Sequence, residues 1–331
     1  MDRIIQPAKR NLTFDFIRTL AIIFVIFVHS MGKMDDAVKN GAGITINIID
    51  STLNSLIHTG VPLFVMLSGA LLLGRDESIK TFFKKRFNRV LIPFTIWSIL
   101  VFILLTYTEG DGFTFQHSLT DFASKFITSG VYGIYWFIYM LLGLYLITPI
   151  LRKVFINSGK SILFYLMILL LCFALFENTK FTVLQQFSSN ISLWTFYFVA
   201  GHIIVKYLQQ YQYFKILSVA GFIISFIACF TNKLYQFTTF PLIIFVSIFI
   251  FSLLIHVNLK PNTGGGIHYI SEISYGIYLS HFIIISVFCR LGLESVVPLW
   301  MEPVVMVLLV TVIECMIFYI IKRTRVKKFL M

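Results

Sequence analysis

The chain contains 331 residues, of which 58% are hydrophobic and only 13% are charged. An ordinary soluble domain carries about 25% charged residues, so this composition excludes that class. Several apolar runs approach the roughly 20 residues that cross a bilayer as a helix, and the alternation typical of an outer-membrane barrel is missing. The sequence therefore predicts an all-α, polytopic membrane helix bundle.

The net charge of +12 follows membrane topology rather than a nucleic-acid surface. Twenty of the 27 Lys and Arg residues fall in the N-terminal arm, in alternate loops and in the C-terminal tail. Cytoplasmic loops of membrane proteins are enriched in these residues, so we expect both termini in the cytoplasm and no nucleic-acid partner. The four cysteines lie in or beside apolar runs without metal-ligand spacing, and no metal site is expected.

Ten spans are predicted within a single membrane domain, residues 1–331, with a short arm (1–11) and a basic tail (322–331). The first span is too long for a cleavable signal peptide and lacks a small-residue cleavage site. The longest expected outer loop runs from Glu109 to Tyr132. The predicted spans are Phe14–Met31, Ile48–Gly74, Val90–Tyr107, Gly133–Leu151, Ile162–Phe176, Ile191–Val205, Ile216–Phe230, Phe240–His256, Ile267–Phe288 and Pro303–Ile321.

Arg18 and His29 frame an apolar run in the first span, eleven residues apart. Eleven helical residues turn the chain about 20° past three full turns and advance it by about 16 Å. Both side chains therefore share one face, with Arg18 nearer the cytoplasm, and Asp15 is one turn before Arg18 and can pair with it. An arginine inside a membrane costs roughly 3 kcal/mol and normally faces protein or water. This face is a functional candidate; the alternative is a structural ion pair and a helix-end histidine.

A basic element, KKRFNRVLIP, follows the second predicted span. Arg86 and Arg89 are three residues apart and share a face if a helix begins here, and Lys85 is adjacent. Arginine binds phosphate oxygens through paired hydrogen bonds, so a cytoplasmic cofactor with several phosphates would suit these side chains. The positive-inside rule explains the same residues without any cofactor.

Three other elements place small, aromatic or polar groups in spans. The sequence VPLFVMLSGALLL contains a Ser-Gly pair suited to close helix packing. Tyr135 and Trp136 open the fourth span at the expected outer interface, where aromatic side chains gather. His281 ends the sequence ISYGIYLSH at mid-span, where it either bonds across helices or serves a site.

These elements occur in an order that resembles the acyltransferase family 3 membrane proteins. The resemblance covers nearly the whole chain and rests on the arginine–ten residues–histidine spacing, FVMLSG, RFNR before a proline, YWFIYMLLGLYLITP and SYGIYLSH. Members are integral-membrane enzymes of bacteria and eukaryotes that O-acylate cell-surface glycans. The resemblance implies a ten-span fold, cytoplasmic acyl-CoA as the donor, and a multi-pass protein in the plasma membrane of a bacterium.

The resemblance also implies roles for individual residues. It matches His29 to the family's catalytic histidine and Arg18, beside Asp15, to its arginine partner. It matches Arg86 and Arg89 to an arginine pair proposed to hold the donor, and the candidate donor site includes Lys85.

The candidates for binding the acceptor are Tyr135, Trp136 and His281. Many family members carry a histidine just before the tryptophan of the fourth span. This chain has Ile134 and Tyr135 there, so the role of that histidine does not transfer.

The sequence thus predicts an integral-membrane O-acyltransferase, with acetyl-CoA as the expected donor and a hydroxyl of a cell-surface or lipid-linked polysaccharide as the acceptor. His29 either takes the proton from that hydroxyl or carries the acyl group itself, and the sequence leaves both open. One alternative is a transporter or flippase with Arg18, His29, His281 and Glu314 along a path, but the sequence lacks the paired halves expected of that class. Another is a membrane scaffold of a glycan-export complex, in which His29 would be dispensable.

Overall fold

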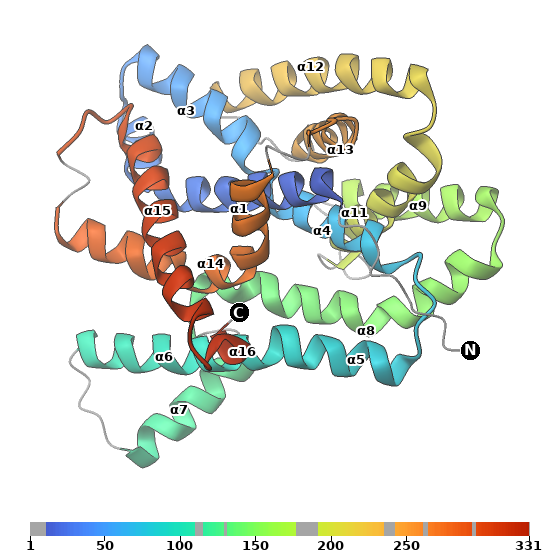
Figure 1. The fold of residues 1–331 in the computed structure, drawn as a ribbon. Coiled ribbons are helices and arrows are strands. Elements are labelled where there is room, and N and C mark those ends of the chain that lie inside the picture. The colour runs from blue at the N-terminus through green and yellow to red at the C-terminus, as the bar shows by residue number, and fades with distance from the viewer. Residues whose placement is uncertain are drawn as a thin grey trace.

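The computed structural model describes residues 11–109, 115–128, 131–176, 191–234, 242–260, 264–292 and 296–330. Within these ranges the chain is helical and contains no strand (Figure 1). The prediction of an all-α polytopic bundle is therefore confirmed. Of the predicted N-terminal arm, residues 1–10 lie outside the described residues.

The helices of the first half of the chain run from α1 to α8. Their bounds are α1 Leu12–Ser30, α2 Gly32–Lys39, α3 Ile44–Ile57, α4 Gly60–Leu72, α5 Ile79–Arg86, the π-helical turn η1 Phe87–Leu91, α6 Ile92–Glu109, α7 Phe115–Ile127, the 3-10 turn η2 Gly133–Tyr135 and α8 Trp136–Asn157.

The second half continues from α9 to α16. Its bounds are α9 Lys160–Phe176, α11 Ile191–Ile203, the π-helical turn η3 Ile204–Leu208, α12 Gln212–Leu234, α13 Leu242–Leu254, α14 Gly265–Arg290, α15 Glu302–Lys322 and α16 Lys327–Leu330.

Eight helical stretches in the described part of the chain are long and apolar enough to cross a membrane. They correspond to eight of the ten predicted spans. The other two, Ile162–Phe176 and Phe240–His256, correspond to the shorter apolar helices Lys160–Leu175 and Leu242–Leu254. The total of ten spans and the side on which the termini lie stay predictions.

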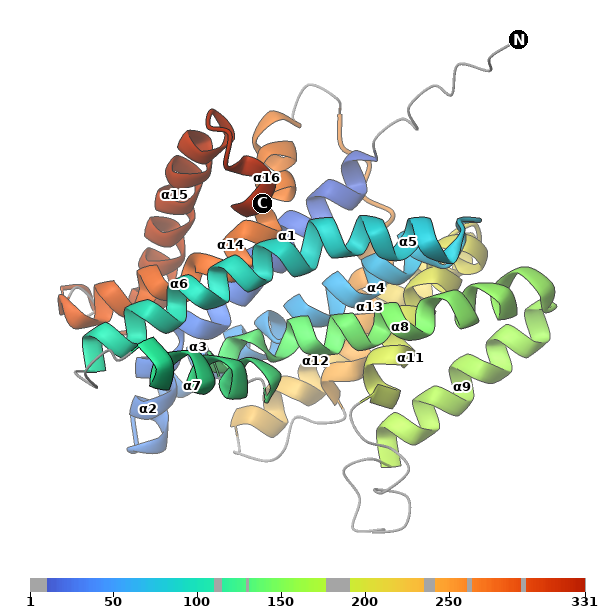
Figure 2. The same ribbon diagram turned by 90° about the horizontal axis from the view of Figure 1, so that it is seen from below.

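Helix α1 lies at the centre of the bundle, where it packs against α14, α4, α15 and α3 (Figures 1 and 2). Its first turn is fixed by Asn11, whose side chain accepts hydrogen bonds from the backbone N–H groups of Thr13 and Phe14. The apolar residues of its middle turns are almost fully buried: Ile17, Ala21, Ile22, Val25 and Ile26. The helix that carries Arg18 and His29 therefore buries the apolar residues of its middle turns against its neighbours.

Helices α5, η1 and α6 follow one another without a gap as one continuous helical stretch, and α8 runs beside it in both views (Figures 1 and 2). Aromatic contacts join the two, with Phe82 against Tyr145 and Phe94 against Tyr135. The π-helical turn η1 falls within the RFNR element. Pro93 has no N–H to donate to the carbonyl of Arg89, the bond that an α-helix would make here, and a wider turn accommodates this.

Two stretches differ from the sequence prediction. The expected outer loop Glu109–Tyr132 contains helix α7, whose Phe122 and Phe126 pack against Phe102 and Phe94. The predicted second span is two helices, because α3 ends at Ile57 and α4 begins at Gly60. Helix α7 is short and amphipathic and lacks a long apolar run, so sequence reasoning easily takes this stretch for a loop.

Segments that the sequence places on the same side of the membrane meet in the structure. On one side, the Thr13 hydroxyl donates to the backbone carbonyl of Val257 at 3.0 Å, and Lys322 binds Glu272 at 2.8 Å. On the other, Lys233 forms an ion pair with Asp35. Each of these contacts joins segments that the sequence assigns to one side of the membrane, which is consistent with the predicted topology.

Helices α4 and α11 approach each other to backbone contact at two glycines. A Cβ atom on Gly69 would lie 1.7 Å from the carbonyl oxygen of Phe198, and one on Gly201 would lie 2.0 Å from that of Met66. Side chains are excluded at both positions, as expected for small residues at helix interfaces in membranes. This contact holds α11 directly against α4.

We predict that Gly69→Ala or Gly201→Ala forces α4 and α11 apart and destabilises the protein by about 3 kcal/mol or more. The measurement is the midpoint of thermal unfolding in detergent. The matched control is Gly143→Ala in α8, where a Cβ atom meets no atom within 4 Å. An unchanged midpoint in both interface variants would contradict the close packing.

Candidate active site

Arg18 is held by a hydrogen-bond chain between α1 and α14. Its Nη1 lies 3.3 Å from the Ser271 hydroxyl, which donates at 2.7 Å to a carboxylate oxygen of Asp15. The direct distance from Arg18 Nη1 to that oxygen is 3.8 Å. The predicted Asp15–Arg18 pair is therefore present, with Ser271 bridging it, and the Asp15 carboxylate is buried.

The Arg18 side chain is 31% exposed, and a second arginine, Arg86, belongs to a basic region on α5 and α8. Arg86 stacks over the rings of Phe82 and Tyr145, with its Cζ 4.8 Å and 5.7 Å from their centroids. Arg86 thus lies on two aromatic rings at the interior end of a basic region.

The predicted donor residues do not share one environment. Arg86 is half-buried, whereas Arg89, in the π-helical turn, and Lys85 are exposed. Lys85 donates a short hydrogen bond to Glu77. That hydrogen bond, reinforced by neighbouring cations, lowers the pKa of Glu77 below its usual value.

Arg152 joins this basic region from α8. Its Nε donates to the carbonyl of Leu72 at 2.8 Å, its Nη2 lies 3.5 Å from Glu77, and its guanidinium stacks over Phe82 at 4.6 Å. Its side chain is 5% exposed. Arg152 therefore ties α8 to the end of α4 and to α5, and brings a second guanidinium to the ring on which Arg86 lies.

His29 ends the last turn of α1 and faces α14. Its ring lies 5.3 Å from that of His281 and 5.4 Å from that of Phe282, measured between centroids. Since Arg18 also contacts α14 through Ser271, both predicted side chains lie on the α14 flank of α1. The helical spacing that predicted one shared face is consistent with this.

His281 presents a defined nitrogen toward this neighbourhood. Its Nδ1 lies 3.0 Å and 2.9 Å from the carbonyl oxygens of Ile277 and Tyr278. Carbonyl oxygens only accept, so Nδ1 carries the hydrogen and Nε2 keeps its lone pair. That Nε2 atom is buried and has no hydrogen-bond partner among the described residues. It is suited to accept a hydrogen bond from His29.

A cavity of about 290 Å³ opens beside His29. Its wall combines aliphatic side chains with a few polar or aromatic groups, among them His29, His58, Trp136, Trp194 and Tyr197. Arg18 is not among its lining residues. A second cavity of about 520 Å³, between α8 and α11, shares Trp136 and Trp194 with the first.

The three predicted acceptor residues are placed differently. Trp136 is 42% exposed and borders both cavities. Tyr135 is fully buried, donates to the carbonyl of Leu279 at 3.0 Å and does not line either cavity. His281 is fully buried beside His29. No group of three or more His, Cys, Asp or Glu side chains in the described ranges is arranged to hold a metal ion.

A family model described as an acyltransferase domain, that of acyltransferase family 3, matches residues 11–320. The chain belongs to this family. No curated protein and no solved structure matches the chain. The match spans α1 to nearly the end of α15 and so includes all of the candidate site residues. The protein is thus a membrane acyltransferase whose acyl group is not an aminoacyl group.

Sequence reasoning missed several parts of the acyltransferase site. Ser271 gave no signal, because a serine in a span is ordinary packing. Arg152 was counted among loop cations, although it follows the fourth span closely enough to be on its helix. His58 lies between two apolar runs, and its place beside His29 depends on the packing of α3 against α1. Trp194 carried no pattern beyond an aromatic residue near a membrane interface.

We predict that Arg152→Met lowers stability by roughly 3 kcal/mol, because it removes a buried cation from the Leu72 carbonyl and from Glu77. The change is read as the thermal unfolding midpoint of the purified acyltransferase. Lys153→Met, at the exposed neighbouring position, is the matched control and should leave the midpoint unchanged. Equal midpoints for the two variants would contradict the role of Arg152 in joining α8 to α4 and to Glu77.

Proposed function

We propose that this acyltransferase is an O-acetyltransferase of the bacterial plasma membrane, using cytoplasmic acetyl-CoA and a hydroxyl of a cell-surface or lipid-linked polysaccharide. The observation that carries the proposal is the placement of His29 on a cavity wall, on the same α14-facing flank of α1 as Arg18. Family membership supports acyl transfer, and the choice of donor, acyl group and acceptor extends it.

The donor side of the proposal rests on the basic region around Phe82. The CoA phosphates would bind near Arg86, with Arg89 and Lys85 supplying further cations at the exposed surface. Lys85 is paired with Glu77, so phosphate binding would compete with that carboxylate. The acyl end of the donor would then pass Tyr145 toward α1.

The reaction side uses the two ends of α1. Arg18, held by the hydrogen-bond chain through Ser271 to Asp15, lines the route of the donor and attracts its negative charge as the donor arrives. His29 either takes the proton from the acceptor hydroxyl or attacks the thioester and carries the acyl group. In both routes the CoA thiolate leaves as a thiol and the acceptor oxygen gains the acyl carbon.

The acceptor side is the 290 Å³ cavity. Trp136 and Trp194 offer flat apolar faces and N–H donors, a combination that suits a ligand with both apolar and hydroxyl surfaces. The cavity is mostly apolar, with few polar groups to orient one hydroxyl. His29 is then the polar group nearest the reacting position.

His29→Ala is predicted to lower acyl transfer by at least about 100-fold, because proton transfer or nucleophilic attack is lost. Two measurements apply: CoA release from acetyl-CoA by the purified protein without any ion gradient, and surface-glycan acyl content by mass spectrometry. The control is His268→Gln, at an exposed position on α14. Wild-type acyl content in the His29→Ala strain would remove the catalytic role, and a gradient requirement would favour a transporter.

The double variant Arg86→Gln/Arg89→Gln is predicted to raise the Kd for acetyl-CoA at least about tenfold, since each charged hydrogen bond contributes roughly 1.5–3 kcal/mol. Calorimetric titration measures the affinity. The single variant Arg89→Gln measures the loss of one charge without the loss of a packing contact, because Arg89 is exposed while Arg86 lies against Phe82. Lys80→Gln serves as an exposed control on the same helix. Undiminished affinity in the double variant would place the donor site elsewhere.

A further inference from the structure

His58 occupies the break between α3 and α4 and faces the same cavity as His29. It is exposed and shares the wall of this cavity with His29. His281 also adjoins His29, but it is fully buried and absent from the cavity wall. An acceptor in the cavity therefore reaches His58 and cannot reach His281.

The hydrogen bonding of His58 leaves its basic nitrogen available. Its Nδ1 lies 3.0 Å from the carbonyl oxygen of Asn54, one helical turn earlier. A carbonyl oxygen only accepts, so Nδ1 carries the hydrogen of the neutral ring. The lone pair is then on Nε2, which makes His58 a proton acceptor with an assigned atom.

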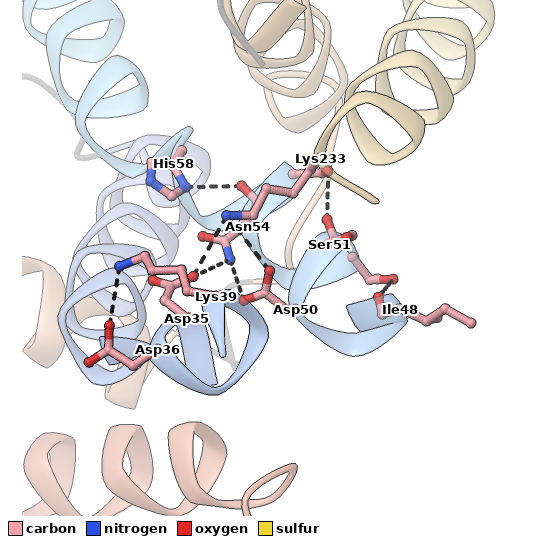
Figure 3. A network of polar contacts seen from close by, with 11 residues as sticks. Asp35, Asp36, Lys39, Ile48, Asp50, Ser51, Asn54, His58 and Lys233 are labelled. Carbon is pink, nitrogen blue, oxygen red and sulfur yellow. Dashed lines mark hydrogen bonds and ion pairs between the residues drawn. The ribbon is translucent and has the colours of Figure 1, made fainter. Parts of the chain in front are cut away.

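A polar network holds the part of α3 that carries His58 (Figure 3). The Asn54 side-chain amide donates to Asp50 at 2.9 Å and to Asp35, on α2, at 3.1 Å. Lys233, on α12, lies 3.7 Å from each of the two carboxylates. Asp50 is only 1% exposed. The network clamps α3 to α2 and α12 one and two turns before His58, and so fixes the ring at the cavity.

The two routes open to His29 differ in what they require of a second base. If His29 takes the hydroxyl proton directly, one imidazole is enough. If His29 carries the acyl group, its reacting nitrogen is bonded to carbon and cannot accept the acceptor's proton. A second base must then lie on the acceptor side of His29, and a neutral imidazole is suited to this at neutral pH. His58 is in that position.

We infer that His58 is the base that takes the proton of the acceptor hydroxyl while His29 carries the acyl group. The inference rests on the proposed function and assigns one of its two routes. In the first step the C–S bond of acetyl-CoA breaks, a C–N bond to His29 forms, and the proton lost from His29 leaves with the thiolate as CoA thiol. In the second step the acceptor oxygen bonds to the acyl carbon and the C–N bond breaks. The hydroxyl proton passes to Nε2 of His58 and returns to His29.

The test uses His58→Gln with two acceptors. In cells, acyl content of the surface glycan is measured by mass spectrometry. In vitro, labelled acetyl-CoA is supplied with hydroxylamine, a neutral nucleophile that attacks an acyl-imidazole without a base and yields acetohydroxamate. His58→Gln should lower glycan acylation by at least about 100-fold and still form acetohydroxamate near the wild-type rate. His29→Ala should form neither product above background, and His268→Gln should resemble wild type.

The other outcomes distinguish a failure of the role of His58 from a failure of the proposed function. Wild-type glycan acylation in His58→Gln would overturn the role of His58, as would loss of both products, which would indicate a donor-side or folding role. Equal acetohydroxamate in wild type and His29→Ala would overturn the acyl-carrying route and with it the role of His58, whereas wild-type glycan acylation in His29→Ala would count against the proposed function itself. A wild-type unfolding midpoint in His58→Gln shows that the altered products do not arise from misfolding.

Discussion

A cationic side chain on a helix in the middle of a membrane bundle must be given partners by the protein, and this constraint shapes the site. Arg18 receives them through Ser271 and Asp15, which requires α14 to lie directly against α1. The same helix pair then brings His281 to His29 about three turns further along. One partner of this guanidinium, Ser271, thus lies on the same helix that brings His281 to His29, and His29 also lines a cavity.

The two ends of α1 consequently face different chemical surroundings. Near Arg18 the helix adjoins a region with several cations, in which Arg86 and Arg152 stack on one aromatic ring and Glu77 holds Lys85. Near His29 it adjoins imidazole, indole and aliphatic groups. The proposed anionic donor would be attracted to the first region, and the proposed hydroxyl acceptor would be tolerated by the second. About 16 Å of helix separates the two regions.

Much of the fold was predictable because hydrophobic length and helical spacing are local properties. The first span, its shared face and the positions of the main helices required only periodicity and charge. The residues that complete the site were not predictable in this way. Ser271 and Asp15 are 256 positions apart, and His58 reaches His29 through the packing of α3 against α1. Arg86 is half-buried, whereas Arg89 is exposed and lies in a π-helical turn. Helix propensity does not reveal such a turn.

Trp136 and Trp194 border both cavities, and their rings lie 5.4 Å apart. The two cavities thus share these indole rings as part of their walls. Rotation of a side chain is faster than movement of a helix. The upper size of a molecule that fits beside His29 is therefore governed by two rotamers, so the range of acceptors can widen or narrow without any change in the arrangement of the bundle.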